Sequence, residues 1–156
     1  SNSKIFSINL FSNYHENLIL TAWNIFSDNK LFGAGPNTYR FNCKFEIYKV
    51  GEDNCNTHPH HTYVQILSEV GIVGFLFVFF AIVFLSFKIF ILIKRRYLKQ
   101  EINNYDYMIC LITCFLLTFF PFLPTLNFFN NWINIIYYLP LGFFLHENYK
   151  NRIIVN

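Results

Sequence analysis

The stretch from Gly71 to Ile93 constrains this chain most, because Lys88 is the one charged residue among its 23. As a helix rising 1.5 Å per residue it would be about 35 Å long, enough to cross the hydrocarbon of a bilayer. A basic cluster follows directly, and basic residues in a short loop mark the cytoplasmic side of a membrane protein; it consists of Lys94, Arg95, Arg96 and Lys99. The sequence therefore predicts a span whose N-terminal end faces outward.

Composition supports a membrane protein, because 54% of the residues are apolar and 13% are charged, against about a quarter charged in soluble domains. Two further apolar stretches are predicted as spans, over about 107–126, where Pro121 and Pro124 kink or end the helix, and over about 129–146. A cytoplasmic C-terminus is expected, because basic residues follow the last stretch. The net charge of +3 without a basic, aromatic-lined face argues against a nucleic-acid partner.

These patterns together predict an all-α membrane protein. An extracytoplasmic helical loop domain over residues 1–69 precedes a membrane domain over residues 70–156, which holds three transmembrane helices, the first at about 71–93. The chain starts at Ser1 without a signal-peptide pattern, and three spans seldom make a complete membrane enzyme. We therefore expect a piece of a longer protein whose other spans lie upstream.

The loop domain is expected to begin with a helix from Tyr14 to Asn29, because apolar residues recur there at three- and four-residue steps. A turn at Gly33-Ala34-Gly35-Pro36 follows, and Asn37 or Thr38 is placed to cap a short helix that carries Arg40. Such a glycine turn is weak evidence of a ligand site by itself, and it lacks the spacing of a nucleotide-binding fingerprint.

Two cysteines, Cys43 and Cys55, lie twelve residues apart in the loop domain. In an oxidising compartment a disulfide between them would contribute roughly 2–4 kcal/mol to stability. The alternative is a pair of free thiols. Cys110 and Cys114 lie in an apolar run, where thiols behave as small hydrophobic side chains.

Three histidines, His58, His60 and His61, stand where the loop domain meets the first span. They are compatible with zinc binding together with Cys43 or Cys55, although the spacing matches no common zinc module. They are also compatible with simple solvation of a helix end. The third possibility is acid–base or acceptor-positioning chemistry beside a phosphate-binding arginine, because histidine titrates near neutrality and arginine binds phosphate in bidentate fashion.

Two stretches resemble the O-antigen ligase and O-antigen polymerase superfamily of bacterial envelope glycosyltransferases. One is Phe32-Gly33-Ala34-Gly35-Pro36 leading to Arg40, and the other runs from His58 to Gly74. The residues from Asn127 to Trp132 and from Tyr138 to Phe143 are similar to the C-terminal end of the family.

The family motif is a histidine, then Asn, Ser or Gln, then nine residues, a glycine, two residues and a glycine. His60, Gly71 and Gly74 take the matching places, and His61 departs from the second place, where the family has an amide or a hydroxyl. Gly71 and Gly74 are expected to let the first span pack closely against a neighbour, and Gly33 and Gly35 to shape their turn.

The resemblance implies a partial GT-C-like fold in the bacterial inner membrane, multi-pass, with the active loop in the periplasm. It implies transfer of a glycan from undecaprenyl diphosphate to a hydroxyl group, without a metal or other cofactor. The acceptor would be lipid A-core, a glycan or a protein. The alternative is a non-enzymatic scaffold or transport subunit with a His/Cys zinc-binding outer loop.

Under the glycosyltransferase hypothesis, Arg40 offsets charge on the leaving diphosphate and His60 activates or positions the acceptor. His58, His61 and Glu69 are expected to line the substrate site. Glu69 lies nine residues beyond His60, about 14 Å along a helix. We therefore expect it to act first as a structural hydrogen-bond partner.

Overall fold

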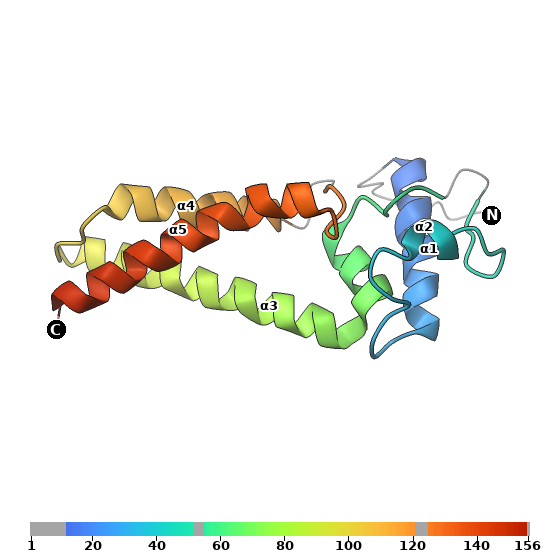
Figure 1. The fold of residues 1–156 in the computed structure, drawn as a ribbon, viewed down its shortest axis with the longest axis horizontal. Coiled ribbons are helices and arrows are strands. Elements are labelled where there is room, and N and C mark those ends of the chain that lie inside the picture. The colour runs from blue at the N-terminus through green and yellow to red at the C-terminus, as the bar shows by residue number, and fades with distance from the viewer. Residues whose placement is uncertain (1–11, 52–54, 121–124, 156) are drawn as a thin grey trace, which may run out of the picture.

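The computed structural model describes residues 12–51, 55–120 and 125–155, and all regular structure within them is helical. The all-α prediction is confirmed for these residues. The helices are α1 (Asn13–Asp28), α2 (Tyr39–Asn42), α3 (Thr62–Tyr97), α4 (Tyr105–Thr118) and α5 (Asn131–Val155). Figure 1 shows two regions, with α1 and α2 gathered at one end and most of α3 running alongside α4 and α5. We call residues 12–70 the head, and α3 beyond Gly71 together with α4 and α5 the rod.

Helix α1 occupies Asn13–Asp28, so the helix predicted from Tyr14 to Asn29 is confirmed to within one residue at each end. Its buried side chains are spaced three and four apart and face the rest of the head; they are Leu18, Thr21, Ala22 and Ile25. They pack against Tyr39 and Cys43 of the neighbouring segment. Figure 1 shows α1 running across the long axis of the molecule.

Helix α3 is broken at Gly71, which has φ 67° and ψ −167°. These angles lie outside the helical region and are accessible to glycine. The nine residues before the break, 62–70, belong to the head, and the helix changes direction at the break, as Figure 1 shows.

The loop between α1 and α2 closes around this break with backbone hydrogen bonds. Ala34 N and Gly35 N donate to the carbonyl oxygens of Ser68 and Glu69, each at 2.9 Å. On the far side of the break, Ile72 N donates to the carbonyl oxygen of Lys30 at 2.9 Å. The loop thus satisfies backbone groups that the broken helix leaves without intrahelical partners.

Two glycines allow the loop and the helix to approach this closely. A Cβ on Gly71 would lie 2.3 Å from the carbonyl oxygen of Leu31, and a Cβ on Gly33 would lie 2.3 Å from the carbonyl carbon of Glu69. Both residues also have positive φ. The close approach expected at Gly71 is present, and the neighbour is the backbone of the loop, whereas a Cβ on Gly74 would meet only the side chain of Val70 in the same helix.

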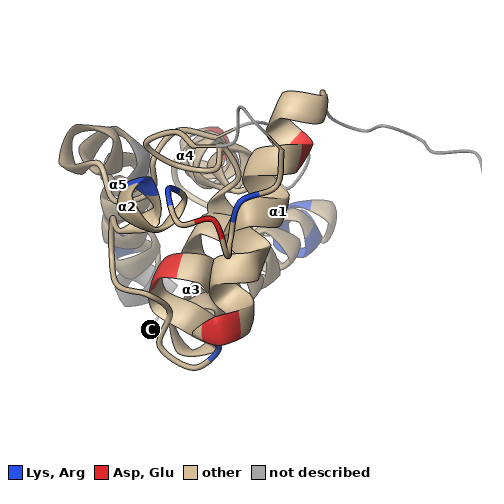
Figure 2. Cartoon of the chain, turned by 90° about the vertical axis from the view of Figure 1, so that its right-hand side faces the viewer, with Lys and Arg blue, Asp and Glu red and all other residues tan. Residues whose placement is uncertain are grey.

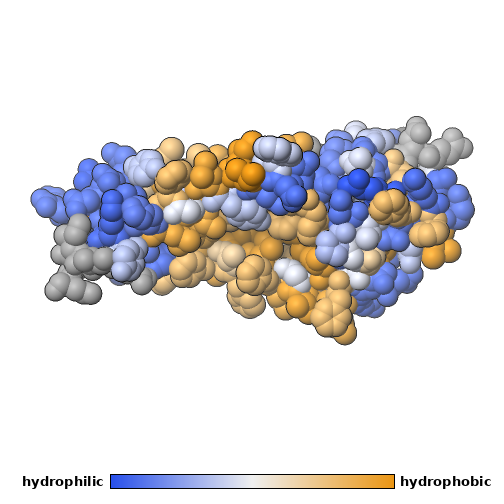
Figure 3. Space-filling model, viewed as in Figure 1, coloured by the Kyte–Doolittle hydropathy of each residue, from blue (hydrophilic) through white to orange (hydrophobic). Residues whose placement is uncertain are grey.

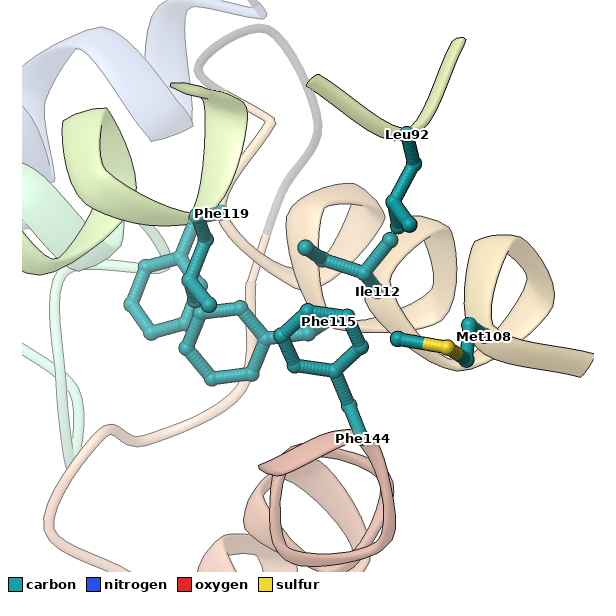
Figure 4. Close-up of a cluster of buried hydrophobic side chains, with 7 residues drawn as sticks. Leu92, Met108, Ile112, Phe115, Phe119 and Phe144 are labelled. Carbon is teal, nitrogen blue, oxygen red and sulfur yellow. The ribbon is translucent and has the colours of Figure 1, made fainter. Parts of the chain in front are cut away.

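The rod is held by an apolar cluster shared among its three helices (Figure 4). Its buried members are Leu85, Leu92, Met108, Ile112, Phe115, Phe119 and Phe144. Many other apolar side chains point outward, so the middle of the molecule presents a broad apolar surface between two polar ends (Figure 3). Such a surface is suited to lipid or to further membrane helices.

Among the described helices, α3 is the one long and apolar enough to cross a membrane, judged by length and composition. Helix α4 has 14 residues, which gives about 21 Å, short of the ~30 Å hydrocarbon thickness. It ends at Thr118 and residues 125–127 are not helical, so the predicted helix over 107–126 is too long. Pro121 and Pro124, which were predicted to kink or end this helix, lie outside the described residues.

Helix α5 extends through Val155, beyond the end predicted at about residue 146. It contains Pro140, whose ring prevents one backbone hydrogen bond without ending the helix. The part of α5 beyond residue 146 carries polar residues. The helix is therefore longer than the apolar stretch from which the span was predicted. The basic residues Lys94, Arg95 and Arg96 lie in the last turn of α3, at the end of the rod away from the head.

Candidate functional site

The turn that carries Arg40 is held by the carboxylate of Glu69. Asn37 N donates to Glu69 Oε2 at 3.1 Å, and Tyr39 N donates to Oε1 at 2.7 Å. The expected cap at Thr38 takes a different form, because its hydroxyl donates to the carbonyl oxygen of Gly35 at 2.6 Å and makes no cap hydrogen bond. Glu69 therefore caps α2 from a distant part of the sequence.

Glu69 is 1% exposed and lies in the head, before the break in α3. Gln65, one turn earlier, donates from Nε2 to Glu69 Oε2 at 3.1 Å. Burial raises the pKa of Glu69, whereas the hydrogen bonds from Tyr39, Gln65 and Asn37 and the charge of Arg40 oppose that rise. A buried carboxylate with three donors has a structural function, which agrees with the first expectation for this residue.

Arg40 is oriented by Asn37 but keeps free hydrogen-bonding capacity. Its Nη2 donates to Asn37 Oδ1, and its Nε is buried without a hydrogen-bond partner in the described part of the chain. An unpartnered buried donor is unfavourable unless a ligand pairs with it. The arrangement leaves a fixed guanidinium donor available for an anion.

Residues 125–128, which we call the strap, cross over the beginning of α3. Asn127 Nδ2 donates to Asn37 Oδ1 at 3.3 Å, and Gln65 Nε2 donates to Asn127 Oδ1 at 2.8 Å. Phe128 N donates to Gln65 Oε1 at 3.0 Å. The strap therefore joins the buried polar face of α3 to the turn that holds Arg40.

The same strap binds the histidine loop, residues 56–61. Thr125 N donates to the carbonyl oxygen of His60 at 3.0 Å, and the hydroxyl of Thr62 donates to that of Thr125 at 2.8 Å. Thr125 and Asn127 are two residues apart, so their Cα atoms are separated by about 7 Å at most. The histidine loop and the Arg40 turn thus meet on one short segment.

His58 is 7% exposed, and protein groups occupy both of its ring nitrogens. Nε2 lies 3.3 Å from the carbonyl oxygen of Thr125 and Nδ1 lies 2.9 Å from the hydroxyl of Thr57. Burial, followed by the nearby His60, lowers the pKa of His58 to about 4, and the hydrogen bond to Thr125 only partly opposes this. His58 is therefore a neutral, fixed residue that supports the loop.

His60 is only partly buried, and its ring lies among other imidazoles. The ring centroids are 4.1 Å from His58 and 5.6 Å from His15 of α1. Burial lowers the pKa of His60, His15 lowers it further, and a backbone hydrogen bond with Thr125 opposes both effects. The imidazole is consequently neutral near pH 7, as a general base must be.

His61 is the N-cap residue of α3, and its Nδ1 accepts a long hydrogen bond of 3.5 Å from Val64 N. N-cap positions favour side chains that accept a hydrogen bond from the first turn, such as Asn and Ser. The departure of His61 from the family motif therefore has a physical explanation, because a histidine nitrogen takes the capping function of an amide or hydroxyl oxygen.

Cys43 and Cys55 form a disulfide, with their Cα atoms 5.2 Å apart. It fastens the segment after α2 to the start of the histidine loop. The pairing also removes both thiolates from the predicted His/Cys zinc set. Among the described residues, no group of three or more His, Cys, Asp or Glu side chains is placed to share a metal ion.

Several residues of this network were not predicted from the sequence as site residues: Asn37, Asn56, Gln65, Thr125 and Asn127. Gln65 and Glu69 are four residues apart, so they lie on one face of a helix. Polar residues at this spacing next to a long apolar run could have identified Gln65 as a network residue from the sequence. The partners on the strap are more than 55 residues away in sequence and only the tertiary structure brings them there. Figure 2 shows this end of the molecule, where charged residues of both signs are dispersed.

The polar, disulfide-tied head thus lies at the end of a helix that is long and apolar enough to cross a membrane. Residues 12–79 match the family model described as O-antigen ligase, and they contain both motifs identified in the sequence. Over that range the chain is similar to the O-antigen ligase family, so the resemblance is confirmed there. The match supports a ligase or glycosyltransferase function and a membrane setting in general. No curated protein and no solved structure matches the chain.

The similarity noted for Asn127–Trp132 and Tyr138–Phe143 lies beyond the matched range. That part of the resemblance remains a prediction. The contacts of the strap with Gln65 nevertheless tie the first of these segments to the matched one.

Proposed function

We propose that this chain forms part of a membrane enzyme that transfers a glycan from undecaprenyl diphosphate to an acceptor hydroxyl at the periplasmic surface of the bacterial inner membrane. The observation that carries the proposal is the strap, which is hydrogen-bonded both to the histidine loop and to the Arg40 turn. One lipid-linked glycan, which carries its diphosphate directly on its reacting carbon, could therefore contact both segments.

Arg40 is assigned to the donor. Negative charge builds on the diphosphate as the bond to the sugar breaks, and preorganised donors at that position stabilise the transition state. Arg40 is held by Asn37 and retains an unpartnered buried Nε, so its guanidinium is prepared to hydrogen-bond phosphate oxygens.

His60 is assigned to the acceptor. The acceptor oxygen forms a bond to the anomeric carbon, while the bond from that carbon to the diphosphate oxygen breaks and the electron pair leaves with the diphosphate. The hydroxyl proton passes to an imidazole nitrogen of His60. A neutral imidazole is required for this step, and the lowered pKa of His60 supports it.

The orientation follows from α3. Its basic C-terminal turn favours the cytoplasmic side, so the head with its disulfide belongs on the oxidising, periplasmic side. Three spans are proposed, with α4 and α5 completing the crossing beside α3. The acceptor would be lipid A-core, a glycan or a protein, and the transfer would need no metal or other cofactor.

The test uses the full-length protein expressed in a strain that lacks it. We expect His60→Ala and Arg40→Ala to lower glycan transfer at least about 100-fold, because each removes a group that acts on the transition state. Arg40→Lys keeps the charge but loses the planar donor pair, and should restore only part of the activity.

The matched control is His146→Ala, since His146 is exposed on α5 in the rod. It should leave transfer unchanged, with equal protein amounts in the membrane for all variants. Retained transfer in His60→Ala or Arg40→Ala would refute the assignment. Activity that is lost on chelation and restored by zinc would instead support the zinc hypothesis.

A further inference from the structure

We infer that Asn56 is a positioning residue that sets the tautomer of His60 and keeps its Nε2 unprotonated; the inference rests on the proposed role of His60 as the base. Asn56 immediately follows Cys55, so the disulfide to Cys43 anchors its backbone. Its amide nitrogen lies 3.1 Å from His60 Nε2 and donates to Tyr14 Oη at 3.0 Å.

The orientation of the Asn56 amide follows from its other contact. Asn56 Oδ1 accepts a hydrogen bond of 2.6 Å from Thr57 N, and a backbone N–H can only donate. Reversing the amide would place its NH₂ group against that N–H, so the oxygen must face Thr57 and the nitrogen must face His60.

This orientation defines the chemistry of His60. An amide NH₂ group has two donors and no acceptor, so His60 Nε2 must supply a lone pair and the ring proton must be on Nδ1. Protonation of Nε2 would set N–H against N–H. Asn56 therefore stabilises the neutral imidazole with its basic nitrogen defined, and an acceptor hydroxyl donates to that same lone pair when it replaces the amide.

The titratable groups that face His60 in the described structure are His58 of the same loop, His15, and Tyr14 of α1, which is joined to His60 through Asn56. The strap contributes the backbone of Thr125, which does not titrate. Asn56 is the side chain that contacts Nε2 of His60, and the ring also has a backbone hydrogen bond with Thr125.

The test is the pH dependence of kcat/KM for the acceptor, measured with the full-length protein in proteoliposomes across about pH 5 to 9, because this profile reports the pKa of the free base. In Asn56→Asp a carboxylate faces Nε2 and stabilises the imidazolium. We expect the acidic limb to move upward by about one unit or more, with at least a ~10-fold loss below that limb and recovery at high pH. Asn56→Ala removes the donor without adding charge, and should move the limb upward by less.

Asn131→Asp is the matched control, because Asn131 is exposed at the first residue of α5 and the same substitution adds the same charge. The acidic limb of the Asn131→Asp pH profile should stay at the wild-type pH. A shift seen only in Asn56→Asp would then come from the pKa of His60 and not from general repulsion between the added charge and the anionic donor substrate. A uniform loss of activity in both Asn56 variants, with an unmoved limb, would show that Asn56 is merely structural and would overturn the inference. If the Asn56→Asp protein does not accumulate, the pH profile of Asn56→Ala is the test. An acidic limb that moves upward supports the inference, and an unmoved limb refutes it.

The two proposals fail in different ways. Full activity of His60→Ala would remove the proposed function and the inference together. An inactive His60→Ala combined with a wild-type pH profile in the Asn56 variants would leave the proposed function in place and refute only the inference.

Discussion

The head and the rod are stabilised by different physics. Every buried polar or charged side chain among the described residues lies in the head: Thr21, His58, Thr62, Gln65, Ser68 and Glu69. The buried members of the rod cluster are apolar, and large side chains such as Phe77, 78% exposed, point outward from it. Directional hydrogen bonds thus fix the head, whereas non-directional packing holds the rod.

The difference explains where chemistry can be placed. A site needs groups held within about 0.5 Å, and a satisfied polar network provides that precision because each member has only one favourable arrangement. An apolar cluster tolerates exchange of similar side chains at little expense in stability. The head should therefore respond to single-atom changes that the rod would accept.

The largest effect is expected where the loop meets the break in α3. In Gly71→Ala the new Cβ would meet the backbone of Leu31, and the residue would keep a positive φ, so we expect a loss of ~3 kcal/mol or more and little folded protein. The measurement is the fraction of monodisperse protein in detergent and its melting temperature.

Two glycine variants serve as controls for that experiment. In Gly142→Ala on α5, no atom apart from the adjacent backbone of its own helix lies within 4 Å of the added Cβ, so this variant should melt within a few degrees of wild type. Gly74→Ala should lie between the two, because its added Cβ would meet the Cβ of Val70 at 2.8 Å but no backbone of the loop. A Gly71→Ala protein as stable as Gly142→Ala would contradict the importance of the backbone contact.

A second, smaller effect is expected at the buried carboxylate. Glu69→Ala leaves the buried N–H of Tyr39 without its acceptor, at roughly 1–3 kcal/mol, and exposes the part-buried N–H of Asn37 to water, whereas the amide of Gln65 keeps Asn127 as a partner. Glu69→Gln keeps one acceptor oxygen and should lose less. Thermal unfolding monitored by fluorescence gives the comparison.

The matched change is Glu46→Ala, because the Glu46 side chain is 84% exposed and its contact is a surface ion pair with Lys49. Such pairs contribute little. Equal destabilisation by Glu69→Ala and Glu46→Ala would mean that the hydrogen bonds of the head do not hold its turn.

The smallest predicted effect is a pH dependence confined to the head. The pKa of His58 is lowered to about 4 in the folded protein, below its ordinary value of 6.5, so the unfolded chain takes up the proton first as the pH falls. The contribution of neutral His58 is complete above pH 6.5 and is lost progressively as the pH falls from 6.5 to about 4, so it does not affect stability at neutral pH.

Melting temperatures between pH 7 and pH 4 check this, with His58→Gln as the reference, because glutamine does not titrate. The wild type should lose more stability than the variant over that interval. Parallel curves for the two proteins would show that His58 is not held neutral by the strap.

Much of the fold could be predicted because apolar periodicity and length are local properties. Helix α1 and the apolar part of α3 follow from the spacing and run of their side chains, and the basic turn after α3 indicates orientation. The ends of α4 and α5 could not be read in the same way, since a helix ends where its backbone partners end and not where its apolar residues do.

The site was predicted in its parts but not in its connections. His60, Arg40, Glu69 and the cysteine pair carry recognisable chemistry, and local spacing relates His60 to Gly71 and Gly74. The hydrogen bonds of Asn127 and Thr125 join segments more than 55 residues apart, and no local pattern encodes them.

By itself the sequence determined a helical chain with an apolar run long enough to cross a membrane, preceded by a segment that holds Arg40 and three histidines. It did so because hydropathy, charge and motif spacing are properties of neighbouring residues. Only the tertiary structure decided that Gly71 breaks α3, that Glu69 holds the Arg40 turn, and that Asn56 faces His60. The first two depend on where distant pieces of backbone meet, which is fixed by the packing of the whole chain, and the third depends on the path of a short loop that the disulfide and the strap hold in place.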